Sequence, residues 1–204
     1  MKNYNRMTKY LFSLSICLTL FSCAAMQTKG SPIAGGQVVD MGIYKVEAPL
    51  GDGWKVKTDK TQGRIEFNKG SKEAGFTSIH ILPGFLNPGT ENQPEDEIVN
   101  MIFGYEEKDI RERGVTRSYY LKDLSKEVTT IGGKKLHVMN YTITDRSRIP
   151  MDIKYAMYLY LPPDLRQKKV FYGFWIGEPS KISESVYETD FTKIDSVISS
   201  FQSK

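Results

Sequence analysis

Alternating apolar and polar positions are most prominent in the second half of the chain, between Lys134 and Gly177. Three runs rich in Tyr, Phe, Val, Ile and Thr lie there, and polar breaks separate them. Each run is largely apolar or β-branched on both of its alternating faces, which is typical of central strands that are covered on both sides. We therefore expect the middle of a sheet to come from Leu136–Thr144, Ile153–Leu161 and Val170–Ile176.

Shorter alternating stretches flank this region. A strand over Glu127–Ile131 leads into Gly132-Gly133, a dipeptide typical of a tight hairpin. Turn residues separate the earlier stretches at meander spacings, so we expect antiparallel pairing and a loop over 83–93. The expected early strands are Tyr44–Ala48, Trp54–Val56, Ile65–Phe67 and Gly75–Ile81, with turns at Leu50–Gly53, Thr61–Gly63 and Lys69–Ser71.

Two stretches have helical spacing instead. Pro94 and three acidic residues open a helix over 94–113, and Gly114 predicts its end. The acidic cluster suits the positive end of a helix, so we do not interpret it as a metal site. An apolar stripe from Tyr187 to Phe201 predicts a terminal helix over 184–202. Two helices and a mainly antiparallel sheet define an α+β domain.

The first residues have the form of an export signal. Three basic residues precede the uncharged run Tyr10–Phe21. Its twelve residues would rise about 18 Å as a helix, against a hydrocarbon core of about 30 Å. We therefore interpret residues 1–22 as a signal peptide rather than a membrane-spanning anchor.

The end of this run, Leu20-Phe21-Ser22-Cys23, resembles the lipobox of bacterial lipoproteins. In that family a small residue precedes a cysteine that becomes the lipidated N-terminus. Ser22 matches the small position and Cys23 the lipidated one, whereas Phe21 occupies a slot that usually holds a smaller residue. The resemblance implies a lipid anchor on Cys23 and a location in the bacterial cell envelope.

The cysteine count agrees with this interpretation. The chain has only Cys17, inside the apolar run, and Cys23, so no disulfide remains once the signal is removed. The alternative is ordinary cleavage after Ala24 or Ala25. In Gram-negative lipoproteins, a residue such as Ala24 after the cysteine resembles the default for outer-membrane sorting.

We expect residues 23–41 to form a flexible, Gly- and Pro-containing tether, with an ordered arm around Val38 and Val39 as the alternative. Residues 42–204 then form a single domain. The leader holds three of the 28 basic residues, so 25 basic and 24 acidic residues remain. A nucleic-acid-binding domain is usually strongly basic, so nucleic acid is not an expected partner.

The order of parts resembles the PsbP-like family, which includes DcrB-type bacterial lipoproteins. The resemblance rests on the strand ending at Pro49, the Gly53-Trp54 turn, the acid-opened helix, the hairpin at Gly132-Gly133 and the closing Ile198-Ser199-Ser200-Phe201. It covers about 42–202 and implies an antiparallel sheet with helices on both sides, an α/β/α sandwich. The implied role is non-enzymatic, as an accessory or binding protein.

No catalytic motif is present. The two histidines, His80 and His137, lie in predicted strands, and we expect neighbouring side chains to bond them. Neither a metal nor a cofactor is expected, and enzymatic activity is not expected either. Two roles remain: an interaction or assembly module with another envelope protein as its partner, or a carrier of a small hydrophobic ligand or lipid in a helix–sheet cleft. Candidate surface residues for either role are Tyr119, Tyr120, Tyr158 and Tyr160.

Overall fold

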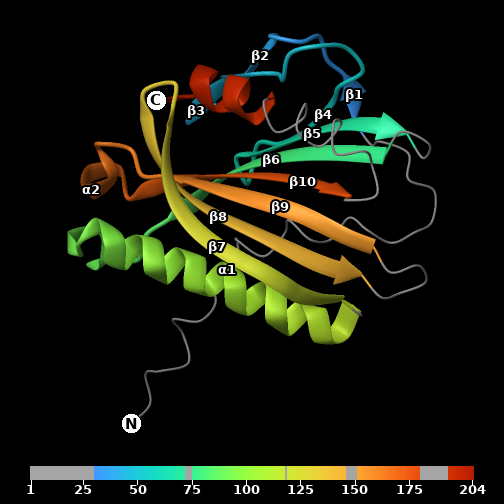
Figure 1. Ribbon diagram of the computed structural model, residues 1–204. Coiled ribbons are helices and arrows are strands. Elements are labelled where there is room, and N and C mark those ends of the chain that lie inside the picture. Colours follow the sequence, from blue (N-terminus) through green and yellow to red (C-terminus); the bar gives the residue numbers. More distant parts are fainter. Residues whose placement is uncertain (1–29, 72–74, 118, 146–150, 180–192) are drawn as a thin grey trace.

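The computed structural model describes residues 30–71, 75–117, 119–145, 151–179 and 193–204. Its main element is an eight-stranded sheet in which every neighbouring pair is antiparallel (Figure 1). From one edge to the other the strands are β1 (Ser31–Pro32), β4 (Lys55–Asp59), β5 (Arg64–Ser71), β6 (Gly75–Phe85), β10 (Val170–Pro179), β9 (Met151–Tyr160), β8 (Lys134–Asp145) and β7 (Tyr119–Ile131).

Two runs of successive strands make up this sheet. Strands β4, β5 and β6 form one meander, and β7 to β10 form another. The two meanders join where β10 pairs with β6, with Trp175 opposite His80. Strands β6 and β10 are thus central, which explains why both faces of β10 are apolar.

Two layers cover the two faces of the sheet (Figure 1). Helix α1 (Glu95–Arg117) lies on one face, which we call the α1 face. The opposite face carries a helix over residues 193–200 and a three-stranded sheet. That smaller sheet has the order β11 (Gln202–Ser203), β3 (Tyr44–Glu47), β2 (Val38–Asp40). The fold is therefore α+β with an antiparallel sheet, as the sequence predicted.

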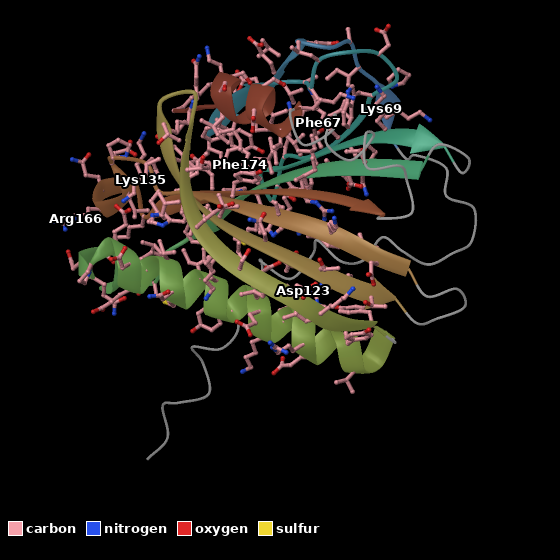
Figure 2. The ribbon with its side chains drawn as sticks, in the orientation of Figure 1. Phe67, Lys69, Asp123, Lys135, Arg166 and Phe174 are labelled. Atoms are coloured by element: carbon pink, nitrogen blue, oxygen red, sulfur yellow. The ribbon has the colours of Figure 1, made fainter. Side chains whose placement is uncertain are left out.

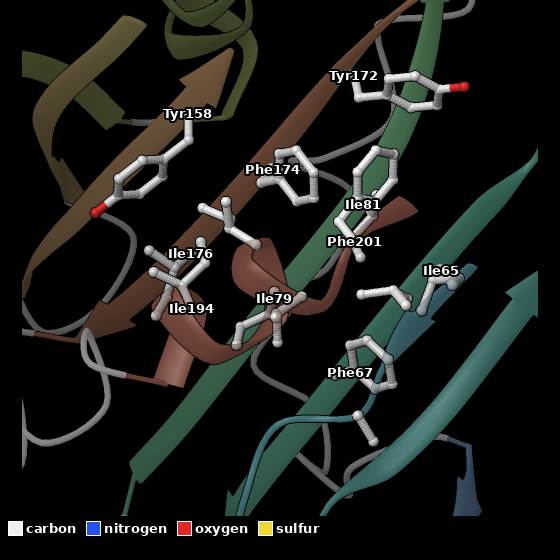
Figure 3. Close-up of a cluster of buried hydrophobic side chains, with 14 of the residues drawn as sticks. Ile65, Phe67, Ile79, Ile81, Tyr158, Tyr172, Phe174, Ile176, Ile194 and Phe201 are labelled. Carbon is white, nitrogen blue, oxygen red and sulfur yellow. The ribbon is translucent and has the colours of Figure 1, made fainter. Parts of the chain in front are cut away.

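The core on the opposite face is rich in aromatic side chains. Phe201 packs against Tyr172 and Phe174, with ring centroids 4.7 Å and 5.1 Å away (Figure 3). The Tyr44 ring lies 5.2 Å from it. Two of these contacts are edge-to-face, a favoured arrangement for aromatic rings. This cluster ties the C-terminal end of the chain to the sheet.

Most apolar side chains lie in the interior of the domain, and most charged side chains lie on its surface. Phe67 and Phe174 belong to the core of the opposite face, whereas Asp123, Lys135 and Arg166 are exposed (Figure 2). Arg166 belongs to α2 (Leu165–Lys168), a short helix that the sequence did not predict. A 3-10 turn, η2 (Thr90–Asn92), precedes α1.

The predicted tether boundary is wrong for residues 31–41. Strand β2 pairs with β3, and the Ile33 N–H donates to the Trp54 carbonyl at 3.1 Å. Ile33 and Met41 are buried in the core. Gly35 and Pro32 resemble linker residues, but the pairing of their neighbours places this stretch within the domain.

Several predicted ends are also wrong. Residues 69–71 extend β5 rather than forming a turn, and β6 continues through the expected loop to Phe85. Helix α1 runs past Gly114 to Arg117. A Cβ at Gly114 would lie 2.6 Å from the Tyr119 carbonyl oxygen, so this glycine permits a close approach instead of ending the helix. Of the predicted terminal helix, residues 184–192 lie outside the described part of the chain.

Candidate functional site

The four candidate tyrosines do not form one surface. Tyr158 is buried in the core of the opposite face, and Tyr160 packs against the same core with its ring 6.2 Å from Phe201. Burial raises the pKa of Tyr158 to about 12. Tyr119 packs on the α1 face instead, and Tyr120 is 39% exposed. The hypothesis of a shared tyrosine surface is therefore wrong, because strand alternation sends these side chains to different layers.

Cys23, the predicted lipidation site, lies outside the described residues. Its role stays a prediction from the sequence. The first strand, β1, begins at Ser31 and pairs with β4. A lipid on Cys23 would thus be joined to the domain at the β1 edge of the large sheet.

A ring of polar side chains lies on the α1-facing side of β5 and β6. Alternate positions of β5 supply Arg64, Glu66 and Asn68, and alternate positions of β6 supply Ser78 and His80. The strand register places Glu66 opposite His80 and Asn68 opposite Ser78. Glu66 and His80 are both buried. Because it joins a buried acid, a buried histidine and a serine, this group is the first candidate for chemistry.

Hydrogen bonds close the ring. Arg64 Nη2 donates to Glu66 Oε2 at 3.2 Å and lies 3.4 Å from His80 Nδ1. Asn68 Nδ2 donates to Glu66 Oε1 at 3.0 Å. Ser78 Oγ donates to Asn68 Oδ1 at 2.8 Å and lies 2.6 Å from His80 Nε2. Arg64 Nε has no hydrogen-bond partner among the described residues, but the five side chains of this largely buried ring bond one another, which is typical of a structural network.

The direction of these bonds decides whether Ser78 could act as a nucleophile. Its proton goes to Asn68, so the short contact to His80 requires His80 Nε2 to be the donor. Arg64 then donates to the unprotonated Nδ1. Burial lowers the pKa of His80, which favours this neutral form. A general base would need a free lone pair facing Ser78, and His80 Nε2 has none in this arrangement.

The sequence prediction for both histidines is confirmed, since each lies in a strand and is bonded by neighbours. His137 Nε2 lies 2.8 Å from Glu95 Oε1, and Lys135 Nζ lies 2.7 Å from the same oxygen. The bonds from Lys135 and His137 hold the pKa of Glu95 below its ordinary value. The first acid of α1 therefore bonds to the neighbouring strand β8, in addition to its place in the first turn of the helix.

A second buried acid, which the sequence analysis missed, lies beneath α1. Glu106 Oε1 accepts a hydrogen bond from Trp175 Nε1 at 3.2 Å and one from the Tyr141 hydroxyl at 3.5 Å. Burial raises the pKa of Glu106 to about 7, and the nearby Asp109 carboxylate adds to this effect. Glu106 lies between apolar positions Ile102, Phe103 and Ile110 of the helix. The only signal in the sequence was that an acid occupied this apolar stripe.

The described residues contain neither a group of side chains suited to a metal ion nor a helix suited to crossing a membrane. Among the residues described, no group of three or more His, Cys, Asp or Glu side chains could hold a metal ion. None of the helices in that part of the chain has the length and apolar character that a membrane crossing requires. No protein-family model matches the chain, and a search of curated proteins returned no significant match.

Proposed function

We propose that this chain is a bacterial envelope lipoprotein whose single domain acts non-catalytically as an interaction or assembly-accessory module. The observation that carries the proposal is Leu20-Phe21-Ser22-Cys23 after the uncharged run, with Cys23 the only cysteine left once residues 1–22 are removed. Lipid on Cys23 holds the domain at the membrane, because several acyl chains on one residue give a stable anchor. Ala24 favours the outer membrane if the source is Gram-negative.

We further propose that the domain is an α/β/α sandwich of the PsbP-like, DcrB type. Its antiparallel sheet has α1 on one face and the helix over residues 193–200 on the other. In such a domain the role is to bind another envelope protein rather than to transform a substrate. The closed hydrogen-bonding of Ser78 and His80 is consistent with that role.

The carrier hypothesis receives less support from the geometry. A lipid-binding cleft lined by tyrosines would need Tyr158 and Tyr160 to face the ligand, and both pack against the core around Phe201. Native mass spectrometry of the protein purified from membranes separates the two roles. A bound lipid released only on unfolding would favour the carrier over the interaction module.

The anchor is tested by Cys23→Ser in the full chain. We expect the variant to lose incorporation of labelled palmitate and to leave the membrane fraction, because the thiol that carries the first lipid is gone. Cys17→Ser is the matched control, since Cys17 lies in the same leader but would leave with it. Unchanged membrane fractionation of Cys23→Ser would refute lipidation, whatever the domain binds.

A further inference from the structure

Glu106 is placed where a charge is poorly accommodated. It projects from α1 into the layer between the helix and the sheet, and its side chain is almost completely buried. Both of its hydrogen bonds, from Trp175 on β10 and Tyr141 on β8, end on the same oxygen, Oε1. Two donors on one oxygen suit a protonated carboxyl group, whose carbonyl oxygen has two lone pairs.

Among the residues that the structure describes, no cation forms an ion pair with this carboxyl group. On α1, Asp109 lies three residues after Glu106 and Arg113 follows one turn later, and these two pair with each other at 2.9 Å. The partners from the sheet are the neutral Trp175 indole and the Tyr141 hydroxyl. From β9, Tyr155 stacks on Tyr141 with ring centroids 5.3 Å apart, and from β7 Tyr119 and Leu124 pack on the same layer.

Lys126 is the cation of β7 on this side, and it lies over a different residue. Its Nζ is 5.8 Å from the centroid of the Phe103 ring, one helical turn before Glu106. Arg113 lowers the pKa of Glu106 and Asp109 raises it, so these two effects oppose each other. Burial has the largest effect on the pKa of Glu106. An ionised Glu106 would hold a negative charge in an apolar layer without a dedicated partner.

We propose that Glu106 is a proton-binding site that fastens α1 to the sheet when protonated and loosens it when the proton leaves to solvent. This goes beyond the proposed function, because it does not depend on the lipid anchor or on a partner. The device has two states. The neutral acid accepts from Trp175 and Tyr141 beneath a docked helix, and the carboxylate favours a helix that lets water reach it.

The direction of the pH effect follows from burial. The pKa of Glu106 is about 7 in the folded chain and 4.5 is its ordinary value, so the docked helix binds the proton more tightly than the opened one. Helix docking is therefore strongest at acidic pH and weakens as the pH rises through about 7. Because the proton affinity of Glu106 differs between the docked and opened helix, the opening equilibrium of α1 can increase by about two orders of magnitude from acidic pH to above about pH 7.

The indole N–H resonances of the full-length protein provide the direct test. The chain has two tryptophans, and Trp54 donates to the Leu50 carbonyl on the other side of the sheet. We expect the Trp175 resonance to shift with a midpoint near pH 7 and the Trp54 resonance to stay constant. In Glu106→Gln, which mimics the protonated acid, the Trp175 shift should disappear.

Hydrogen exchange of the α1 amides measures the opening itself. After correction for intrinsic rates, we expect opening to rise about 100-fold between acidic and mildly alkaline pH in the original chain and to stay flat in Glu106→Gln. Glu107→Gln is the matched control, because Glu107 pairs with Arg111 on the outside of the helix. A Trp175 titration that persists in Glu106→Gln, or that is absent from the original chain, would overturn the proposal.

Discussion

At the scale of single residues, glycines decide how the aromatic side chains lie on the α1 face. A Cβ at Gly177 would come within 2.3 Å of the Tyr155 ring, and one at Gly173 within 2.3 Å of the Trp175 ring. Each ring therefore lies over a neighbouring glycine, in the space that a side chain would fill. In this position the Trp175 indole N–H is within reach of Glu106.

Gly177→Ala tests this arrangement. We expect it to lower the free energy of unfolding by about 1–3 kcal/mol, because the added methyl group forces Tyr155 out of its position. Gly104→Ala is the control, since a Cβ there meets nothing within 4 Å and Gly104 lies inside helix α1. It should raise stability by about 0.5–1 kcal/mol through helix propensity. Equal effects of the two substitutions in chemical denaturation would contradict the packing argument.

The same residues show what sequence reasoning cannot reach. The run Gly173 to Ile176 was correctly predicted as part of a strand, which continues through Gly177, but nothing in the sequence says which ring will lie over which glycine. Likewise, Arg64, Glu66 and Asn68 alternate as a solvated strand face would. What the local pattern does not give is the register of β5 and β6, which places His80 opposite Glu66 and Ser78 opposite Asn68.

At the scale of elements, the β7–β8 hairpin contacts the terminal helix through its turn. Gly132 and Gly133 both have positive φ, 57° and 75°, as a two-residue hairpin turn requires. A Cβ at Gly132 would lie 2.6 Å from the Ser199 Cα, and a Cβ at Gly133 would meet nothing within 4 Å. The two glycines thus have the same backbone role but different surroundings.

This difference predicts different costs for Gly132→Ala and Gly133→Ala. The second should destabilise by about 1 kcal/mol from backbone strain alone. The first should cost about 3 kcal/mol, because strain is joined by a clash with backbone that cannot rotate away. Thermal or urea denaturation measures both, and a smaller loss for Gly132→Ala would show that the turn does not press on the helix.

Element types were more predictable than element ends. The eight strands predicted before residue 82 and from residue 127 onward, and the acid-opened helix, are all present. The predicted ends of these elements were wrong where a glycine, read as a turn or stop signal, makes a close packing contact instead. Gly84 lies beneath the Phe171 ring within β6, and Gly114 permits the approach of Tyr119. A glycine in the sequence does not by itself indicate a turn or a helix end, because close packing also requires a residue without a side chain.

At the scale of the whole molecule, two buried groups respond to pH in opposite directions. Glu106, with its raised pKa, contributes stability below 4.5 that is lost as the pH rises through about 7. His80 is kept neutral by burial, and its pKa lies below the ordinary value of 6.5. Stability from His80 is present above that value and is lost as the pH falls, because only the unfolded chain takes up the proton there. The two slopes offset each other in mildly acidic solution.

Denaturation of single variants across pH separates the two slopes. In Glu106→Gln the free energy of unfolding should rise with pH between about 4.5 and 6.5, since only the His80 slope remains. In His80→Gln it should fall by about 2–3 kcal/mol from about pH 4.5 to about pH 7. The original chain should be flatter than either in that window. Parallel curves for all three proteins would show that neither group is linked to folding.

The position of β10 between β6 and β9 also has a consequence for biosynthesis. The large sheet needs β10 to join its two meanders, and β10 is the last of its eight strands in chain order. Until residues 170–179 are made, β6 and β9 lack the strand that pairs with both of them. Late, long-range closure delays stable folding. A chain whose large sheet stays open until β10 is made is suited to threading across a membrane before it matures, as the leader proposed above would demand.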